Sequence, residues 1–171
     1  SVGVGTYNQG QIGYFDNVTI AGTDADGSYD FEPPTPCTAT CYVDTATGND
    51  ANGGDTAATA KKTIQAALNQ VDAGGTVIGA PGTYAESPDI SASVSLQSTG
   101  GSAVTIIDLQ TGPTYLGSLT IGGAGSDVAI EGFTIEGRDA DCPTTLAASN
   151  IFLEGGPDEV NIVDNVIKVG A

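Results

Sequence analysis

The chain has 171 residues and a formal net charge of −17, with 21 Asp plus Glu against 4 Lys plus Arg. A surface this acidic repels nucleic acids and anionic membranes, because phosphate groups are bound by clusters of Lys and Arg, and no apolar run is long enough to cross a bilayer. Histidine is absent, which excludes a Ser-His-Asp triad, and 25 glycines favour an all-β chain with tight turns and little helix.

The first 22 residues contain two strand-like runs, residues 2–7 and 12–20. The stretch Gly-Tyr-Phe-Asp-Asn-Val-Thr-Ile at 13–20 resembles the last strand of concanavalin-like or laminin-G-like jelly-roll modules. Residues 1–22 are then the tail of a preceding module, strands packed against the following domain, or an arm that adds to a neighbouring subunit's sheet edge. Asn17 begins Asn-Val-Thr, a glycosylation acceptor in a secreted protein.

An acidic, proline-rich linker is expected over residues 23–40, where prolines stiffen the chain towards an extended form. Asp24, Asp26 and Asp30 alternate around a glycine, as in the first half of a calcium loop, but the closing glutamate is missing. Two interpretations stay open for these aspartates, a weak calcium site and a solvated linker.

The three cysteines are Cys37, Cys41 and Cys142. With no histidine and no Cys-x-x-Cys motif, a zinc site is not expected. In a secreted protein this odd number predicts one disulfide and one remaining thiol. We favour a bond between Cys37 and Cys41, and the alternative is a bond from one of them to Cys142.

A polar loop follows the short strand Tyr-Val-Asp at 42–44. It is rich in the hard oxygen donors that calcium prefers, which makes it the best metal candidate in the chain. Asn and Asp also form turns by bonding their own backbone, so a purely structural role is the alternative. The candidate ligands are Asp44, Asn49, Asp50, Asn52 and Asp55.

One helix is predicted, over residues 63–71. Ile64, Ala67, Leu68 and Val71 are spaced at i, i+3, i+4 and i+7, which places them on one apolar helical face. A threonine at 59 or 63 can cap the start, and the glycine pair at 74–75 ends the helix.

The order of several short motifs identifies a family resemblance. The motifs are Tyr-Val-Asp at 42–44, Lys-Thr-Ile-Gln-Ala-Ala at 62–67, Gly-Gly-Thr-Val at 74–77 and Ala-Pro-Gly-Thr-Tyr at 80–84. Together they resemble the opening of pectate-lyase-like right-handed parallel β-helix proteins, and the resemblance covers residues 41–171. It implies an all-β fold, a right-handed parallel β-helix (β-solenoid) with one N-terminal capping α-helix. The strand-like runs that follow in the chain predict about four coils.

An internal repeat supports this fold independently. Residues 128–137 and 160–169 align at an offset of 160 − 128 = 32, with apolar residues alternating with polar ones. The alignment predicts that Val128 stacks on Val160, Ile130 on Ile162 and Ile135 on Ile167. A turn residue, Gly132 or Asp164, breaks each copy at the same place, and Asn165 is expected to bond backbone groups of adjacent coils.

Catalytic residues are implied only by the resemblance. Lyase members of that superfamily use a Lys or Arg base, for which Arg138 and Lys168 are the candidates. Hydrolase members use paired aspartates. Here the candidate pairs are Asp139 with Asp141, and Asp164 with a glutamate at 131 on the preceding coil.

Two functional hypotheses follow. The first is an extracellular or virion-surface scaffold or adhesive module, stabilised by calcium. It would present a face to glycans, or to neighbouring copies through residues 1–22 or an open C-terminal coil. The alternative is the N-terminal part of a polysaccharide lyase or glycoside hydrolase, with most catalytic coils beyond residue 171. Under either hypothesis the chain is expected to be part of something longer.

Overall fold

The computed structural model describes residues 18–22, 25–29, 36–109, 117–137 and 150–168. The chain divides into two units, residues 1–34 and 35–171. In the first unit, β1 (Val18–Gly22) and β2 (Ala25–Tyr29) form an antiparallel hairpin. Strand β2 therefore occupies part of the stretch expected to be a linker.

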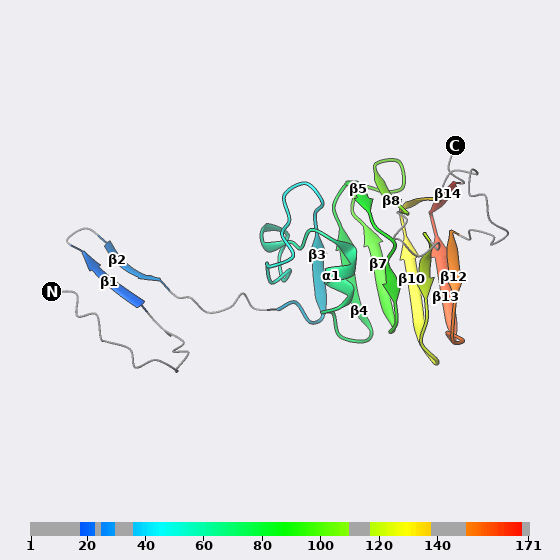
Figure 1. Cartoon of the computed structure of the whole chain (residues 1–171), viewed down its shortest axis with the longest axis horizontal. Coiled ribbons are helices and arrows are strands. Elements are labelled where there is room, and N and C mark those ends of the chain that lie inside the picture. Colours follow the sequence, from blue (N-terminus) through cyan, green and yellow to red (C-terminus); the bar gives the residue numbers. More distant parts are fainter. Residues whose placement is uncertain (1–17, 23–24, 30–35, 110–116, 138–149, 169–171) are drawn as a thin grey trace, which may run out of the picture. The chain divides into compact units, whose positions relative to one another are not determined.

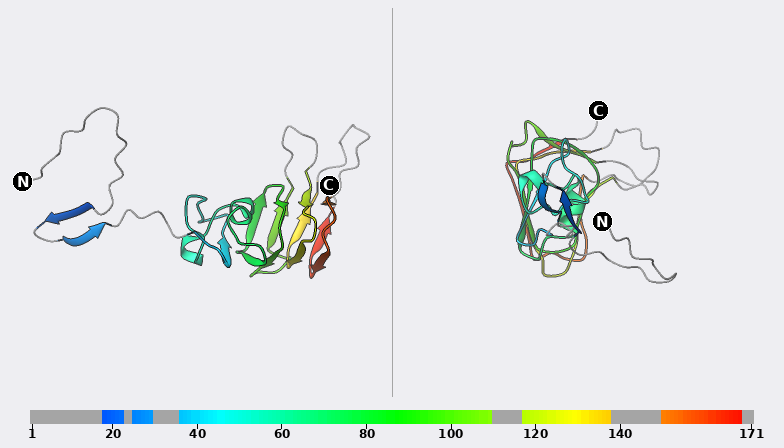
Figure 2. Two further views of the ribbon diagram at one scale, coloured as in Figure 1. Left: turned by 90° about the horizontal axis from the view of Figure 1, so that it is seen from below. Right: turned by 90° about the vertical axis from the view of Figure 1, so that its left-hand side faces the viewer.

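The second unit is a parallel β-solenoid built from three sheets (Figures 1 and 2). The five-stranded sheet contains β3 (Thr40–Val43), β4 (Gly75–Gly79), β7 (Val94–Ser98), β10 (Asp127–Glu131) and β13 (Glu159–Val163). The four-stranded sheet contains β5 (Gly82–Ala85), β8 (Thr105–Asp108), β11 (Thr134–Glu136) and β14 (Val166–Lys168). The three-stranded sheet contains β6 (Asp89–Ile90), β9 (Leu119–Ile121) and β12 (Ile151–Leu153).

Three complete coils, β4–β6, β7–β9 and β10–β12, lie between β3 and the last pair, β13 and β14. The all-β solenoid class is thus confirmed, with about one complete coil fewer than the four expected. The predicted stacking is confirmed as well, because Val128 pairs with Val160, Ile130 with Ile162 and Ile135 with Ile167.

The core consists of inward-facing apolar side chains that stack from coil to coil. In the five-stranded sheet, one such column runs through Cys41, Val77, Leu96 and Ile130, all of which are 0% exposed. Each coil buries its inner face only by contact with the next coil, as in other repeat architectures. Full burial of one such side chain stabilises the fold by about 1.5–3 kcal/mol.

The bend between the first two sheets relies on an unusual backbone geometry. Gly132 has a φ of 79° and Asp164, one coil later, has a φ of 53°. Asn165 stabilises this bend: its Oδ1 accepts from the amide of Phe133 at 2.8 Å, and its Nδ2 donates to the carbonyl of Ile130 at 2.7 Å. The expectation that Asn165 links adjacent coils is therefore confirmed.

The N-terminal end of the solenoid is closed by a loop, a 3-10 turn η1 (Ala57–Thr59) and helix α1 (Ile64–Leu68). The helix is shorter than predicted and is capped by Thr63, but Leu68 and Val71 still pack against the core. The loop covers the outer edge of β3, since Tyr42 N donates to Gly54 O at 2.8 Å and a parallel bridge joins Val43 to Lys61.

A buried disulfide joins Cys37, just before the first strand of the solenoid, to Cys41 in β3. It is the pairing favoured from the sequence, while Cys142 lies outside the described residues. Among the helices that the structure describes, none has the length and apolar character needed to span a membrane.

A matched pair of substitutions tests the stacking. Ile130 is 0% exposed and its partner one coil later, Ile162, is 38% exposed. We expect Ile130→Ala to lower the free energy of unfolding by about 2–5 kcal/mol, and Ile162→Ala to cost less than half of that. Urea denaturation of both variants measures the difference, and equal losses would contradict coil-on-coil burial.

Candidate functional site

A groove of about 530 Å³ runs across the outer face of the five-stranded sheet. It crosses β7, β10 and β13, which stand side by side in Figure 1. The groove is lined by Ala73, Gly74, Ser93, Val94, Ser95, Asp127, Val128, Ala129, Glu159 and Asn161.

The register of the strands explains why a hollow forms here. Ser95, Ala129 and Asn161 pair in register on three successive strands, so their side chains form one outward column. The central member is an alanine, whose methyl group leaves space between the serine and the asparagine. Adjacent parallel strands lie about 4.8 Å apart, so three segments distant in sequence become neighbours.

The rim of the groove is polar and acidic. Asp127 and Glu159 are in-register partners on β10 and β13, and both are exposed. Asn161 Nδ2 donates to Glu159 Oε1 at 2.7 Å, and the amide of Asp127 donates to Ser93 Oγ at 3.0 Å. Hydroxyl, amide and carboxylate groups thus converge on the hollow, and its charge disfavours anionic ligands.

None of these groove residues was proposed from the sequence. The signal that would have found the acidic pair is the repeat itself, because 159 − 127 = 32 is the same offset that aligns the aliphatic residues. Outward positions carry no apolar periodicity, so the repeat pattern identifies core residues more readily than surface ones.

Of the proposed catalytic groups, the structure describes only Asp164, its partner Glu131, and Lys168. Arg138, Asp139 and Asp141 lie outside the described residues. Asp164 occupies the bend after β13, and Glu131 pairs in register with Val163, not with Asp164. Lys168 is exposed on β14, opposite Glu136, and does not line the groove. Catalytic roles for these residues therefore stay predictions.

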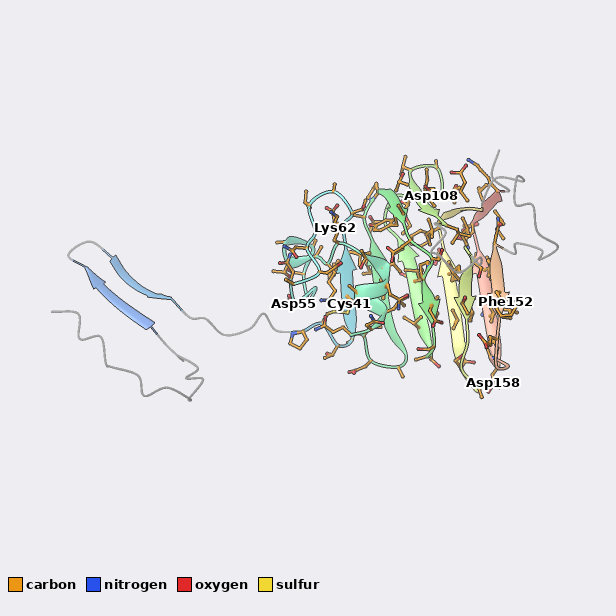
Figure 3. All side chains as sticks on the ribbon, viewed as in Figure 1. Cys41, Asp55, Lys62, Asp108, Phe152 and Asp158 are labelled. Carbon is orange, nitrogen blue, oxygen red and sulfur yellow. A yellow bond between two sulfur atoms is a disulfide. The ribbon has the colours of Figure 1, made fainter. Side chains whose placement is uncertain are left out.

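The loop proposed to bind calcium uses its oxygens to form turns. Asp44 Oδ1 accepts from the amide of Ala46 at 2.8 Å, and Asn49 Oδ1 accepts from the amide of Ala51 at 3.0 Å. Asp55 Oδ1 accepts from the hydroxyl of Thr59 at 2.7 Å. Figure 3 shows the position of Asp55 in this capping loop.

Two more of the candidate ligands are also engaged. Asp50 Oδ1 accepts from the amides of Lys62 and Thr63, both at 2.9 Å, and Asn52 Nδ2 donates to Ala60 O at 3.0 Å. Lys61 is 4% exposed, and its ammonium donates to the carbonyls of Asp50 and Asn52 at 3.2 and 2.8 Å. A lysine thus supplies the positive charge inside this loop.

Within the described ranges, no group of three or more Asp, Glu or Cys side chains is arranged to hold a metal ion. The loop's side chains make these hydrogen bonds with protein groups, and calcium binding by them stays a prediction. For the other set of candidates, Asp24 and Asp30 lie outside the described residues, and Asp26 lies in β2.

The start of α1 is capped by a carboxylate from the next coil. Glu86 Oε1 accepts from the amide of Ile64 at 2.7 Å, and Oε2 accepts from the amide of Gln65 at 2.9 Å. Burial raises the pKa of Glu86, although these two amides oppose the shift. In contrast, hydrogen bonds from the Thr47 hydroxyl and nearby amides lower the pKa of Asp44.

Comparison with known proteins gives no further assignment. No protein-family model matches the chain. A search of curated proteins and a search of solved structures likewise found no match. The fold and the groove are therefore the observations on which a function must be based.

The calcium prediction can be tested by thermal unfolding. A ligand that binds only the native state raises its stability, so calcium binding would give a higher Tm with excess calcium than with a chelator. Asp55→Asn is the matched variant, and it should abolish the difference if the ion binds in the capping loop. An unchanged Tm for the parent chain would contradict calcium binding.

The raised pKa of Glu86 predicts a pH-dependent contribution to stability. The folded chain binds this proton more tightly than the unfolded chain, so Glu86 favours folding more as the pH falls from neutral through its raised pKa. We expect the unfolding free energy of the parent minus that of Glu86→Gln to increase over this pH range. Urea denaturation at a series of pH values measures it.

Asp44→Asn is the control with the opposite sign. Because the pKa of Asp44 is lowered, its contribution is present above the carboxyl's unfolded pKa and is lost as the pH falls through the lower folded value. The difference between the parent and Asp44→Asn should therefore shrink on acidification. Parallel pH profiles for the two variants would contradict these assignments.

Proposed function

We propose that this solenoid is an extracellular surface scaffold that presents the groove on its five-stranded sheet to glycans. The observation that carries the proposal is the in-register column of Ser95, Ala129 and Asn161, flanked by Asp127 and Glu159. A sugar chain offers many hydroxyl groups, and such groups are bound by hydrogen bonds to hydroxyl, amide and carboxylate side chains placed around a hollow.

The charge of the groove narrows the class of glycan. Asp127 and Glu159 lie at its rim, and no lysine or arginine is among the lining residues. Neutral or amino sugars suit this surface, whereas uronic acids would be repelled by the carboxylates. The same reasoning weighs against a polysaccharide lyase acting on uronates in this groove, and no described residue favours the hydrolase alternative.

The proposed location outside the cell is supported by the cysteines. The Cys37–Cys41 disulfide is buried, with the two residues 1% and 0% exposed. Disulfides persist in oxidising compartments and at cell or virion surfaces, and are rare in the cytosol. In the proposed adhesive role, the rigid solenoid holds its groove away from the surface to which the protein is attached.

Binding to an array of neutral, amino and acidic glycans tests the proposal. We expect binding to neutral or amino glycans, and Ala129→Gln should weaken it about tenfold or more by filling the hollow without changing the charge. Thr83→Gln, at an exposed position on the four-stranded sheet, is the matched control and should bind as the parent does. Binding that survives Ala129→Gln, or no binding to any glycan, would contradict the proposal.

A further inference from the structure

A second, smaller hollow lies on the outer face of the five-stranded sheet, between the capping loop and the paired strands β3 and β4 (Figure 1). Its volume is about 130 Å³, against about 530 Å³ for the groove. Most of its lining residues are apolar or aromatic, whereas half of those in the groove carry polar side chains. The hollow is lined by Tyr42, Val43, Asp44, Ala57, Ala60, Ile78, Ala80 and Thr99.

The strand register builds the floor of this hollow. Tyr42 and Ile78 pair in register on β3 and β4, and each alternates with buried residues, so both side chains lie on the outer face of the sheet. The capping loop is hydrogen-bonded along the edge of β3 and supplies the opposite wall with Ala57 and Ala60. The short side chains of these alanines leave space next to the larger tyrosine and isoleucine.

Two side chains bring hydrogen-bond acceptors to the hollow. The hydroxyl of Thr99 donates to Gly79 O at 3.2 Å, so its oxygen keeps lone pairs that can accept a bond. Asp44 Oδ2 accepts from the hydroxyl of Thr47 at 2.6 Å, and a carboxylate oxygen has a second acceptor site. No lysine or arginine is among the lining residues. The hollow therefore suits a small apolar group that carries an N–H donor, and it disfavours a carboxylate.

One side chain connects the hollow to the groove. Gln97 on β7 is the in-register neighbour of Ile78, and its Nε2 donates to Ser95 Oγ at 3.0 Å. Ser95 in turn lines the groove. Ile78 and Ser95 are one strand and two residues apart, which corresponds to about 8 Å for a strand spacing of about 4.8 Å and a rise of about 3.3 Å per residue. A short oligosaccharide can therefore reach both the hollow and the groove.

We propose that the hollow beside Tyr42 is a subsite for the acetamido group of an N-acetylhexosamine in the glycan that the groove binds. The acetamido methyl group packs against Ile78, and its N–H donates to Thr99 or Asp44. The inference rests on the proposed function and adds a sugar class and a second position on the sheet. The methyl group displaces water that apolar walls cannot hydrogen-bond, whereas the ammonium of a free amino sugar would lose its own hydration there.

Titration calorimetry of the full chain with matched tetrasaccharides tests the subsite. The probes are β-1,4-linked tetramers of N-acetylglucosamine, glucose and glucosamine. We expect the acetylated tetramer to bind about tenfold more tightly than the glucose tetramer, from one buried methyl group and one hydrogen bond. Equal affinities would overturn the subsite and leave the proposed function standing. Failure of these tetramers and of every array glycan to bind would overturn both.

Substitutions in the hollow and in the groove should have different effects. Ala57→Leu fills the hollow and Ile78→Asn makes its floor polar, and each should remove the preference for the acetylated tetramer without changing the Kd of the glucose tetramer. Ala129→Gln, in the groove, should weaken both tetramers. Ala51→Leu, at an exposed position of the same capping loop that does not line the hollow, is the matched control. Circular dichroism checks that the variants fold, and a preference that survives both hollow substitutions would overturn the proposal.

Nuclear magnetic resonance tests the geometry without any substitution in the hollow. In saturation-transfer difference spectra of the acetylated tetramer, one acetyl methyl group should receive the strongest transfer from the protein. Nuclear Overhauser contacts should join this methyl group to the ring protons of Tyr42 and the methyl groups of Ile78. Strongest transfer to the ring protons of the sugars, or methyl contacts to groove residues alone, would overturn the assignment.

Discussion

The stacking of inward aliphatic side chains from one coil to the next is the interaction on which this structure depends. Leu96 and Ile130 are 0% exposed because each lies between the coils on either side of it. No coil can bury its own inner face, so a coil without a neighbour must be covered by other parts of the chain. The described N-terminal end is closed by a loop, a short helix and a buried disulfide.

The parts of the fold that this stacking controls could be predicted from the sequence. The offset of 32 residues identified in-register partners such as Ile135 and Ile167, because an error of one residue in register would turn the aliphatic side chains outward. It also identified the bend, where Gly132 and Asp164 adopt positive φ, and the amide of Asn165 that joins two coils. The helical spacing likewise found the residues that reach the core, although α1 ends at Leu68.

The polar features could not be predicted in the same way. A loop rich in Asn and Asp has the composition of a calcium site and equally that of a series of turns, and only the geometry shows that Asp50 caps backbone amides. Lys61 is buried, and its ammonium donates to two loop carbonyls, an arrangement that its position in a polar stretch does not reveal. Strand β2 lies at the start of the stretch expected to be a linker, because pairing with β1 outweighs the low strand propensity of its Asp26 and Gly27.

A parallel solenoid separates the residues that fold it from those that a ligand meets. Inward positions are constrained by stacking, whereas outward positions such as Ala129 and Asn161 are constrained only by solubility and by one another. In-register pairing also converts a separation of 159 − 127 = 32 residues into the spacing of adjacent strands, about 4.8 Å. Asp127 and Glu159 are therefore held close together on β10 and β13, and their mutual repulsion is tolerated because both are exposed to water and salt. A ligand that covers this rim also removes some of that water. Such a ligand is accommodated best when it supplies hydroxyl or ammonium donors to the two carboxylates. The register that stacks the aliphatic core is the one that places these carboxylates side by side, so the core determines the chemistry of the groove.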